Sequence, residues 1–265
     1  MNDIPKEQRN SLKAFLDRKA FDFNTPAFIE SDPISVPHKF SRKQDVEIAA
    51  FFSAVFAWGN RTTIIQKSTE LMKRMDMCPF EFCLNYTYND LKKLSGFKHR
   101  TFNQTDLFYF IEFLHLHYSE FESLETAFFI QDRTLQIREK VEALLNSFYH
   151  YFFSDENAPT RTRKHIAAPE KHSTCKRLNM FLRWMVRKDN KGVDFGIWKS
   201  ISPSELICPI DVHVARVAKR FNMLKRNAID WQAAVELTRY LRELDPVDPI
   251  KYDFALFGLG VLEKY

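Results

Sequence analysis

A carboxylate, a histidine and basic side chains follow one another in residues 209–220, at the start of a predicted helix. Asp211 comes first, followed by His213 and Arg216. A carboxylate there would stabilise positive charge that develops on a substrate, or steer a nucleophile, and the basic side chains would bind phosphate. Aspartate is also favoured at a helix N-terminus, where it accepts hydrogen bonds from unpaired backbone amides. Capping alone therefore explains Asp211 equally well.

Positive charge is concentrated in residues 161–191, although the formal net charge of the whole chain is only +5. The acidic residues of this window are Glu170 and Asp189. Its basic residues are Arg161, Arg163, Lys164, Lys171, Lys176, Arg177, Arg183, Arg187, Lys188 and Lys191. Such a concentration predicts contact with a polyanion such as nucleic acid, while a solvated loop and helix face would give the same pattern.

The elements that must position these residues are predicted to be helices. The chain of 265 residues is 45% hydrophobic and contains 26 phenylalanines but only 6 glycines, too few turn residues for a sandwich or barrel. Apolar side chains recur at helical spacing. Helices are expected over residues 4–18, 43–56, 62–75, 105–121, 133–153, 175–187, 209–221, 231–244 and 249–257. Gly59 would end one helix and Asn60 would cap the next. Loops are expected at the proline-rich residues 26–37 and the polar, basic residues 154–172.

Several classes of protein are excluded by the same sequence. The 4 cysteines form no Cys-x-x-Cys pair, so we expect reduced thiols. His165, His172 and Cys175 lack a fourth partner, and we expect neither a metal nor another cofactor. The N-terminus is polar and no apolar run is long enough to span a bilayer. We therefore expect a cytoplasmic protein without membrane contact, and a monomer.

The string Pro-Ile-Asp-Val-His-Val-Ala-Arg-Val at residues 209–217 resembles a signature of the helix-hairpin-helix (HhH-GPD) DNA glycosylase superfamily, Pro-(Val/Ile)-Asp-x-His-Val-x-Arg-(Val/Ile). Further resemblance lies in residues 48–64, 176–187 and 248–260. The whole chain looks like an uncharacterised bacterial family that forms a remote branch of these enzymes, nearest the archaeal 8-oxoguanine glycosylases. The resemblance implies one all-α unit over residues 1–265, with two packed helical lobes and an active cleft between them. Residues 154–172 would form a basic loop before the catalytic-type C-terminal part.

The resemblance implies base-excision DNA repair. A glycosylase of this kind flips a damaged purine, such as oxidised guanine, out of duplex DNA and removes it. Asp211 would stabilise the sugar cation. Lys176, in a Lys-x-x-x-x-Phe-x-Arg pattern that resembles the archaeal branch, would form a Schiff base that permits strand cleavage by an AP lyase step, helped by the neighbouring cations Arg177 and Arg183. Lys191 is the alternative nucleophile, and Asp211 would activate water if no lysine serves.

The remaining candidate residues would hold the DNA. Those implied to contact it are His213, Arg177, Arg183, Arg187, Lys191, Arg216, Asn60 and Arg61. The turn with Trp58 and Asn60 would fill the gap left by the extruded base, and Phe254 and Phe257 would stack on that base. The three aromatic residues are equally well explained as core.

One element of the superfamily is missing. Its glycine-rich hairpin, Leu-Pro-Gly-x-Gly-x-x-(Thr/Lys), should precede Asp211, where this chain has Asn-Lys-Gly-Val-Asp-Phe-Gly-Ile-Trp at residues 190–198. The chain therefore lacks the pattern that supplies both the phosphate-binding amides of the hairpin and the usual position of the nucleophilic lysine. Two other hypotheses therefore stay open: a non-catalytic DNA-binding relative of the glycosylases, and a helical interaction protein whose basic face binds an acidic partner.

Overall fold

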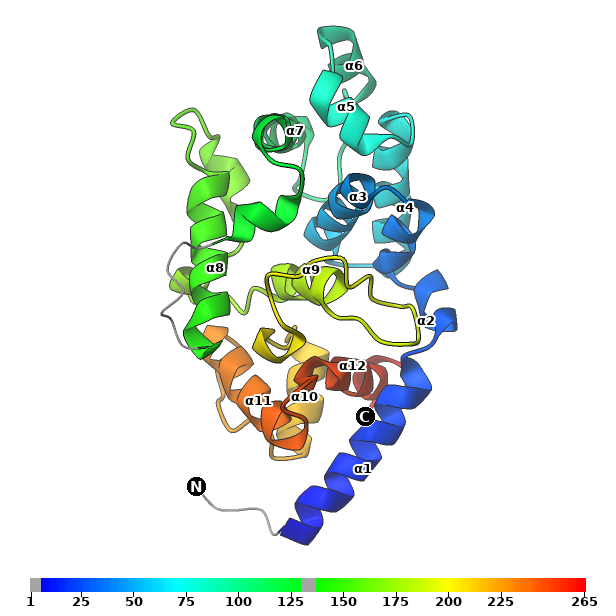
Figure 1. Cartoon of the computed structure of the whole chain (residues 1–265), viewed down its shortest axis with the longest axis vertical. Helices are drawn as coiled ribbons and strands as arrows, with labels where there is room; N and C mark the ends of the chain where they lie inside the picture. Colours follow the sequence, from blue (N-terminus) through cyan, green and yellow to red (C-terminus); the bar gives the residue numbers. More distant parts are fainter. Residues whose placement is uncertain (1–5, 130–136) are drawn as a thin grey trace. The chain divides into compact units, whose positions relative to one another are not determined.

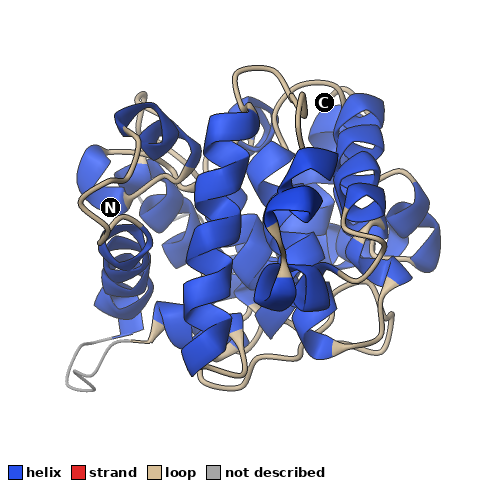
Figure 2. Cartoon of the chain, turned by 90° about the horizontal axis from the view of Figure 1, so that it is seen from above, coloured by secondary structure: helices blue, strands red, loops and turns tan. Residues whose placement is uncertain are grey.

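The computed structural model describes residues 6–129 and 137–265, which form helices joined by turns and loops, with no β-strand among them (Figure 1, Figure 2). The prediction of an all-α fold is confirmed. The chain divides into two compact units. The first unit contains the described residues up to Phe28, with His172–Gly196 and Ile201–Tyr265. The second unit contains Ile29–Lys171 and Ile197–Ser200.

The second unit is built around one buried helix, α3 (Lys43–Phe56), whose bounds agree with the prediction. Every residue of its last three turns is buried, because the sequence is apolar around nearly the whole helix. The rings of Phe51 and Phe52 lie 5.7 and 5.8 Å from that of Phe110, between centroids. The other helices of this unit are α4 (Arg61–Arg74), α5 (Pro79–Asn85), α6 (Tyr88–Lys93), α7 (Gln104–Glu120) and α8 (Ile137–Phe152).

A buried carboxylate within α3 ties a distant segment to this unit. Glu47 accepts hydrogen bonds from Trp198 Nε1 at 2.7 Å, Tyr118 Oη at 2.9 Å and the Leu124 backbone amide at 3.0 Å. A buried charge is stable only when its lone pairs are satisfied in this way. The segment Ile197–Ser200 therefore belongs to the second unit although its neighbours in the chain do not.

Several short helices differ from the expectations. The proline-rich stretch forms α2 (Pro26–Glu30) and two 3-10 turns, Pro33–Ser35 and Pro37–Lys39, rather than a loop. Proline suits the first turn of a helix, and each of these elements begins with one. Helices α5 and α6 were not expected at all. The expected start of α8, Arg133, lies outside the described residues.

The basic stretch of residues 154–172 is not a plain loop either. It contains the 3-10 turns Thr160–His165 and Pro169–Lys171. Asp106 of α7 holds the first of them: its Oδ1 accepts from Thr162 Oγ1 at 2.8 Å, its Oδ2 lies 3.3 Å from His165 Nε2, and Arg161 forms an ion pair with it. Part of the positive charge of residues 154–172 is therefore neutralised by a carboxylate within the second unit.

Asp106→Asn is expected to lower the free energy of unfolding by on the order of 2 kcal/mol at neutral pH. Burial alone would raise the pKa of Asp106, but hydrogen bonds from His165, the Asn103 amide and Thr162 lower it from 3.8 to about 2. Because the folded-state pKa is depressed, this stabilisation is present above about pH 4 and is lost as the pH falls through about 2. Urea unfolding across this range should show wild type and variant converging, whereas the exposed Asp155→Asn should match wild type throughout.

The first unit joins the two ends of the chain (Figure 1). Its helices are α1 (Lys6–Phe23), α9 (Lys176–Val186), α10 (Val212–Arg220), α11 (Trp231–Leu244) and α12 (Tyr252–Val261). Helix α12 packs against both α1 and α10, and a glycine serves each contact. A Cβ at Gly258 would lie 2.2 Å from the Phe23 ring, and one at Gly260 would lie 3.1 Å from the His213 carbonyl oxygen.

Gly258→Ala is expected to lower the free energy of unfolding by about 1–2 kcal/mol. The Phe23 ring must move to admit the new methyl group, and this outweighs the gain in helix propensity of roughly 1 kcal/mol. Thermal or urea unfolding measures the change. In a Phe23→Ala background the same substitution should no longer destabilise, and an equal loss in both backgrounds would contradict the explanation.

Of three helices in this unit whose starts were predicted, one begins as expected and two begin differently. Asp230 caps α11 as predicted, accepting from the Ala233 amide at 3.0 Å. Helix α9 is preceded by Cys175 in a left-handed conformation, with φ of +51°, rather than by a Ser or Thr cap. Pro209 lies before α10 instead of in its first turn, because the helix begins after Asp211.

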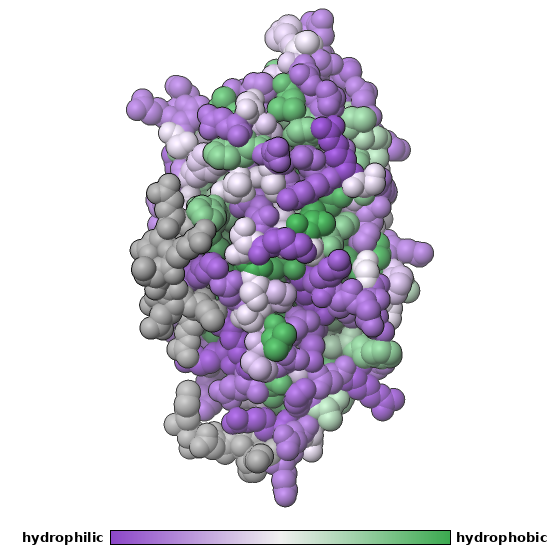
Figure 3. All heavy atoms as spheres, viewed as in Figure 1, coloured by the Kyte–Doolittle hydropathy of each residue, from purple (hydrophilic) through white to green (hydrophobic). Residues whose placement is uncertain are grey.

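No described helix combines the length and the apolar character that a bilayer crossing requires. On the face drawn in Figure 3, hydrophobic residues lie in separate small patches among hydrophilic ones.

Candidate functional site

Asp211 is the N-cap of α10 and is half-exposed. Its Oδ1 accepts hydrogen bonds from the amides of His213 at 2.9 Å and Val214 at 3.0 Å. Oδ2 accepts none from the described residues. One oxygen thus fixes the orientation of the carboxylate, and the other remains available to a bound molecule.

Lys176 is the first residue of α9 and is half-buried. Its Nζ lies 3.5 Å from the sulfur of Met180, one turn along the same helix. Within the part of the chain that the structure describes, no direct ion pair ties this amine to a carboxylate. The side chain is therefore held over an apolar patch of its own helix.

Asp253 of α12 joins these two residues electrostatically, and the sequence analysis did not select it. It is 5% exposed and accepts a hydrogen bond from Arg183. Burial raises the pKa of Asp253 to about 6, the charges of Arg183 and Lys176 oppose this rise, and the charge of Asp211 adds to it. Residues from α9, α10 and α12 therefore act on one buried carboxylate. An acidic residue within an otherwise apolar helix is the sequence pattern that would have identified Asp253.

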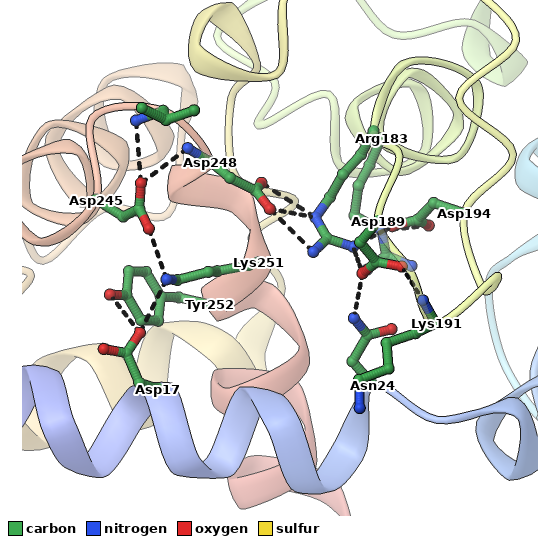
Figure 4. Close-up of polar contacts among 12 residues, drawn as sticks. Asp17, Asn24, Arg183, Asp189, Lys191, Asp194, Asp245, Asp248, Lys251 and Tyr252 are labelled. Carbon is green, nitrogen blue, oxygen red and sulfur yellow. Dashed lines mark hydrogen bonds and ion pairs between the residues drawn. The ribbon is translucent and has the colours of Figure 1, made fainter.

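The predicted phosphate contacts Arg183 and Arg187 are buried, at 4% and 3% exposure. Both bind Asp194: the Arg183 Nε–Oδ1 distance is 3.2 Å and the Arg187 Nη1–Oδ2 distance is 3.0 Å. Arg187 also lies 2.9 Å from Asp248. Figure 4 labels Arg183 together with the carboxylates Asp194 and Asp248. Burial opposes the charge of Arg187, but Asp194 and Asp248 hold its pKa above the ordinary value. In this arrangement both guanidinium groups serve internal carboxylates, and neither is placed to reach a DNA phosphate.

The other cations of this unit have separate roles. Lys191 Nζ lies 3.6 Å from the centre of the Phe21 ring, near the start of the chain. Arg216 donates to the carbonyl oxygens of Gly260 at 2.7 Å and Tyr265 at 3.0 Å, at the C-terminal end of α12. Burial lowers the pKa of Arg177 to about 10, so this residue stays charged at neutral pH. His213 is exposed beside Asp211.

The aromatic residues proposed for a base pocket differ in burial. Phe254 is 1% exposed and belongs to the core, with the Arg183 guanidinium 4.4 Å above its ring. Phe257 is half-buried. Both rings contact Phe28, at 5.4 and 6.3 Å between centroids.

The polar turn after α3 lies in the second unit. Asn60 caps α4 as predicted, accepting from the Thr63 amide at 3.1 Å, and Arg61 is the first residue of that helix. Trp58 is half-buried under Arg100, whose guanidinium carbon lies 4.7 Å from the centre of the indole ring.

The segment that replaces the glycine-rich hairpin is irregular. From the end of α9 to the 3-10 turn Pro203–Glu205, the structure contains no helix. The amides of Phe195 and Gly196 return to the carbonyl oxygen of Trp184, at 2.8 and 3.4 Å. This loop supplies the buried Asp194 rather than a row of amides that faces solvent. No three His, Cys, Asp or Glu side chains gather as a metal site within the described residues.

Comparison with known proteins gives one match. The model of a family described as "Protein of unknown function (DUF2400)" matches residues 32–262, which is most of the chain. Neither a curated protein nor a solved structure matches it.

Proposed function

The chain belongs to the DUF2400 family, whose function is unknown, and we propose that it is a DNA glycosylase that removes a damaged purine, such as oxidised guanine, from duplex DNA. One observation carries the proposal: α9, which begins with Lys176, and α10, which Asp211 caps, both contact α12, through the Arg183–Asp253 hydrogen bond and the packing of Gly260 on the His213 carbonyl group. An amine and a carboxylate in one neighbourhood are what glycosidic bond cleavage through a Schiff base requires.

In the proposed reaction, Nζ of Lys176 attacks C1′ of the flipped nucleotide. The N-glycosidic bond breaks, and its electron pair leaves with the base, which takes up the proton that the neutral amine releases as the Nζ–C1′ bond forms. Asp211 Oδ2 faces the positive charge on the sugar and lowers the barrier. The imine that forms with the opened sugar permits cleavage of the strand, and borohydride would reduce it to a stable amine.

Phosphate contacts in this proposal come from exposed cations, since Arg183 and Arg187 are occupied internally. His213 lies next to Asp211 and would contact the phosphate beside the flipped nucleotide. Within the first unit, which contains Lys176 and Asp211, the basic window contributes the exposed cation Lys188.

The test is incubation of the protein with duplexes that carry a panel of damaged bases, oxidised guanine first, with and without borohydride. Base loss appears as alkali-labile sites, and the imine as a covalent protein–DNA adduct. Both products support the glycosylase with lyase activity, and base loss without adduct supports Asp211-activated water. Neither product across the panel would overturn the proposal.

The runner-up is a DNA-binding relative without catalysis. It is favoured by the irregular loop that stands where the glycine-rich hairpin is expected, and it predicts affinity for DNA without any base loss. An acidic protein partner for the basic face is supported by an absence of both base loss and DNA affinity.

A further inference from the structure

A tight turn in the second unit places an arginine in an unfavourable backbone conformation. Hydrogen bonds of 2.9 Å in both directions between His99 and Phe102 close a two-residue turn. Arg100 is the first residue inside it, with φ of +55°, where glycine is the usual choice. A non-glycine residue persists in such a conformation where its surroundings or its function require that side chain.

A second residue with a positive φ, Gly59, lies beside the Arg100 side chain. Gly59 has φ of +103°, and a Cβ there would lie 2.3 Å from Nη1 of Arg100. A side chain at residue 59 would therefore collide with the guanidinium in its present place, where its carbon lies 4.7 Å from the centre of the Trp58 ring. Gly59 and Arg100 come from different turns, and the backbone conformations of both residues allow the Arg100 guanidinium to lie over the Trp58 indole.

The indole below Arg100 is held by packing. His99 meets the Trp58 ring edge-on at 6.0 Å, and within the described residues the indole N–H has no hydrogen-bond partner. The turn itself is fixed from the basic segment, because Arg161 donates to the Thr101 carbonyl oxygen at 2.9 Å. Packing therefore holds the Trp58 ring in place, and a hydrogen bond fixes the turn that carries Arg100.

The upper side of this stack is open. Arg100 is exposed, and it forms no ion pair with a carboxylate in the described part of the chain. Two other arginines of the same unit are neutralised: Arg161 pairs with Asp106, and Arg74 with Glu70 at 2.8 Å. A stacked guanidinium without a counter-ion offers a planar face to a ligand and N–H groups along its edge.

We propose that Arg100 and Trp58 form a stacking site for an unpaired nucleobase, with the base on the outer face of the guanidinium and a neighbouring phosphate at its N–H edge. Arginine planes and aromatic rings are common platforms for unstacked bases. An acidic peptide would use the N–H groups alone, whereas an exposed guanidinium over an indole offers a planar surface as well as a charge, and this suits a ligand that is both planar and anionic. The inference rests on the proposed function, because an extruded base leaves an unpaired partner in the opposite strand.

The test compares two single-stranded oligonucleotides of equal length by fluorescence anisotropy, one of thymidines and one of base-free abasic units. Wild type should bind the thymidine strand about tenfold more tightly, as expected for one stacked base. Arg100→Lys keeps the charge and removes the plane, so it should lose this preference and bind the base-free strand as wild type does. The matched control is Arg226→Lys, an exposed arginine of the first unit paired with Asp230, which should retain the preference.

A second variant separates a ligand-binding role from a structural one. Arg100→Gly removes the stack but suits the left-handed backbone, so its unfolding temperature should be at least that of wild type while its preference for bases is lost. A marked fall in the unfolding temperature would instead assign Arg100 to the stability of the fold and overturn the inference.

The outcomes also separate this inference from the proposed function. A base preference that survives in Arg100→Lys overturns the stacking site and leaves the glycosylase intact. A preference that depends on Arg100, without base excision from any duplex, supports the stacking site and overturns the glycosylase. Wild-type affinity for a polyglutamate peptide but for neither strand overturns both.

Discussion

Asp211→Asn is expected to slow base excision by about two to three orders of magnitude and to leave the affinity for damaged duplex DNA as high as that of wild type or higher. Asparagine caps helices about as well as aspartate does, so the bonds to the His213 and Val214 amides would persist and α10 would keep its start. The variant therefore removes the charge and little else. Single-turnover rates of base release and binding by anisotropy measure the two quantities.

The chain offers a matched control for this variant. Asp230 caps α11 with nearly the same backbone conformation that Asp211 has at α10, accepting from the Ala233 amide and pairing with Arg226, so Asp230→Asn makes the same chemical change at another helix cap. It should excise at the wild-type rate. If Asp211→Asn also excises at that rate, the role of Asp211 is capping alone. Equal losses in both variants would attribute the effect to the caps rather than to the carboxylate charge.

Lys176→Gln is expected to abolish the borohydride-trapped adduct entirely, because glutamine has no amine to form the imine. The side chain is half-buried and its amine lies 3.5 Å from the sulfur of Met180, with no ion pair to a carboxylate among the described residues, so the fold should tolerate the change. Gel shift or mass spectrometry of the trapped complex measures the adduct, and unfolding temperature verifies the fold.

Lys191→Gln serves as the control for that experiment. Lys191 lies over the Phe21 ring, away from the start of α9, so this variant should trap as wild type does. An adduct that survives in Lys176→Gln and disappears in Lys191→Gln would transfer the nucleophile to Lys191. An adduct in both variants would exclude both assignments.

The sequence predicted the helix caps well because capping is local. Asn60, Asp211 and Asp230 each accept from an amide two or three residues ahead, so the residue type and the apolar pattern behind it are sufficient. The bounds of α3 were predicted for a similar reason, since a long apolar run is read without knowledge of its partners. The short helices α5 and α6 carry too few residues for a periodic pattern.

The roles of charged residues in the candidate site could not be read in the same way. Asp189, inside the basic window, pairs with Arg187. The window ended before Asp194, and Asp253 and Asp248, which also neutralise these arginines, lie far along the chain. A count of charges along the sequence treats each side chain as solvated, whereas folding brings these groups together inside the first unit. Asp253 was missed for the same reason, because its neighbours in sequence are apolar and its electrostatic neighbours are on other helices.

The packing of α1 against α12 fixes the order in which a growing chain can mature. A ribosome releases α1 before α12, with the nearly continuous second unit between them. The second unit is thus able to fold during synthesis, while the face of α1 that receives Gly258 stays uncovered until α12 has emerged. A nascent polypeptide that stops before α12 would present that apolar face to chaperones and proteases.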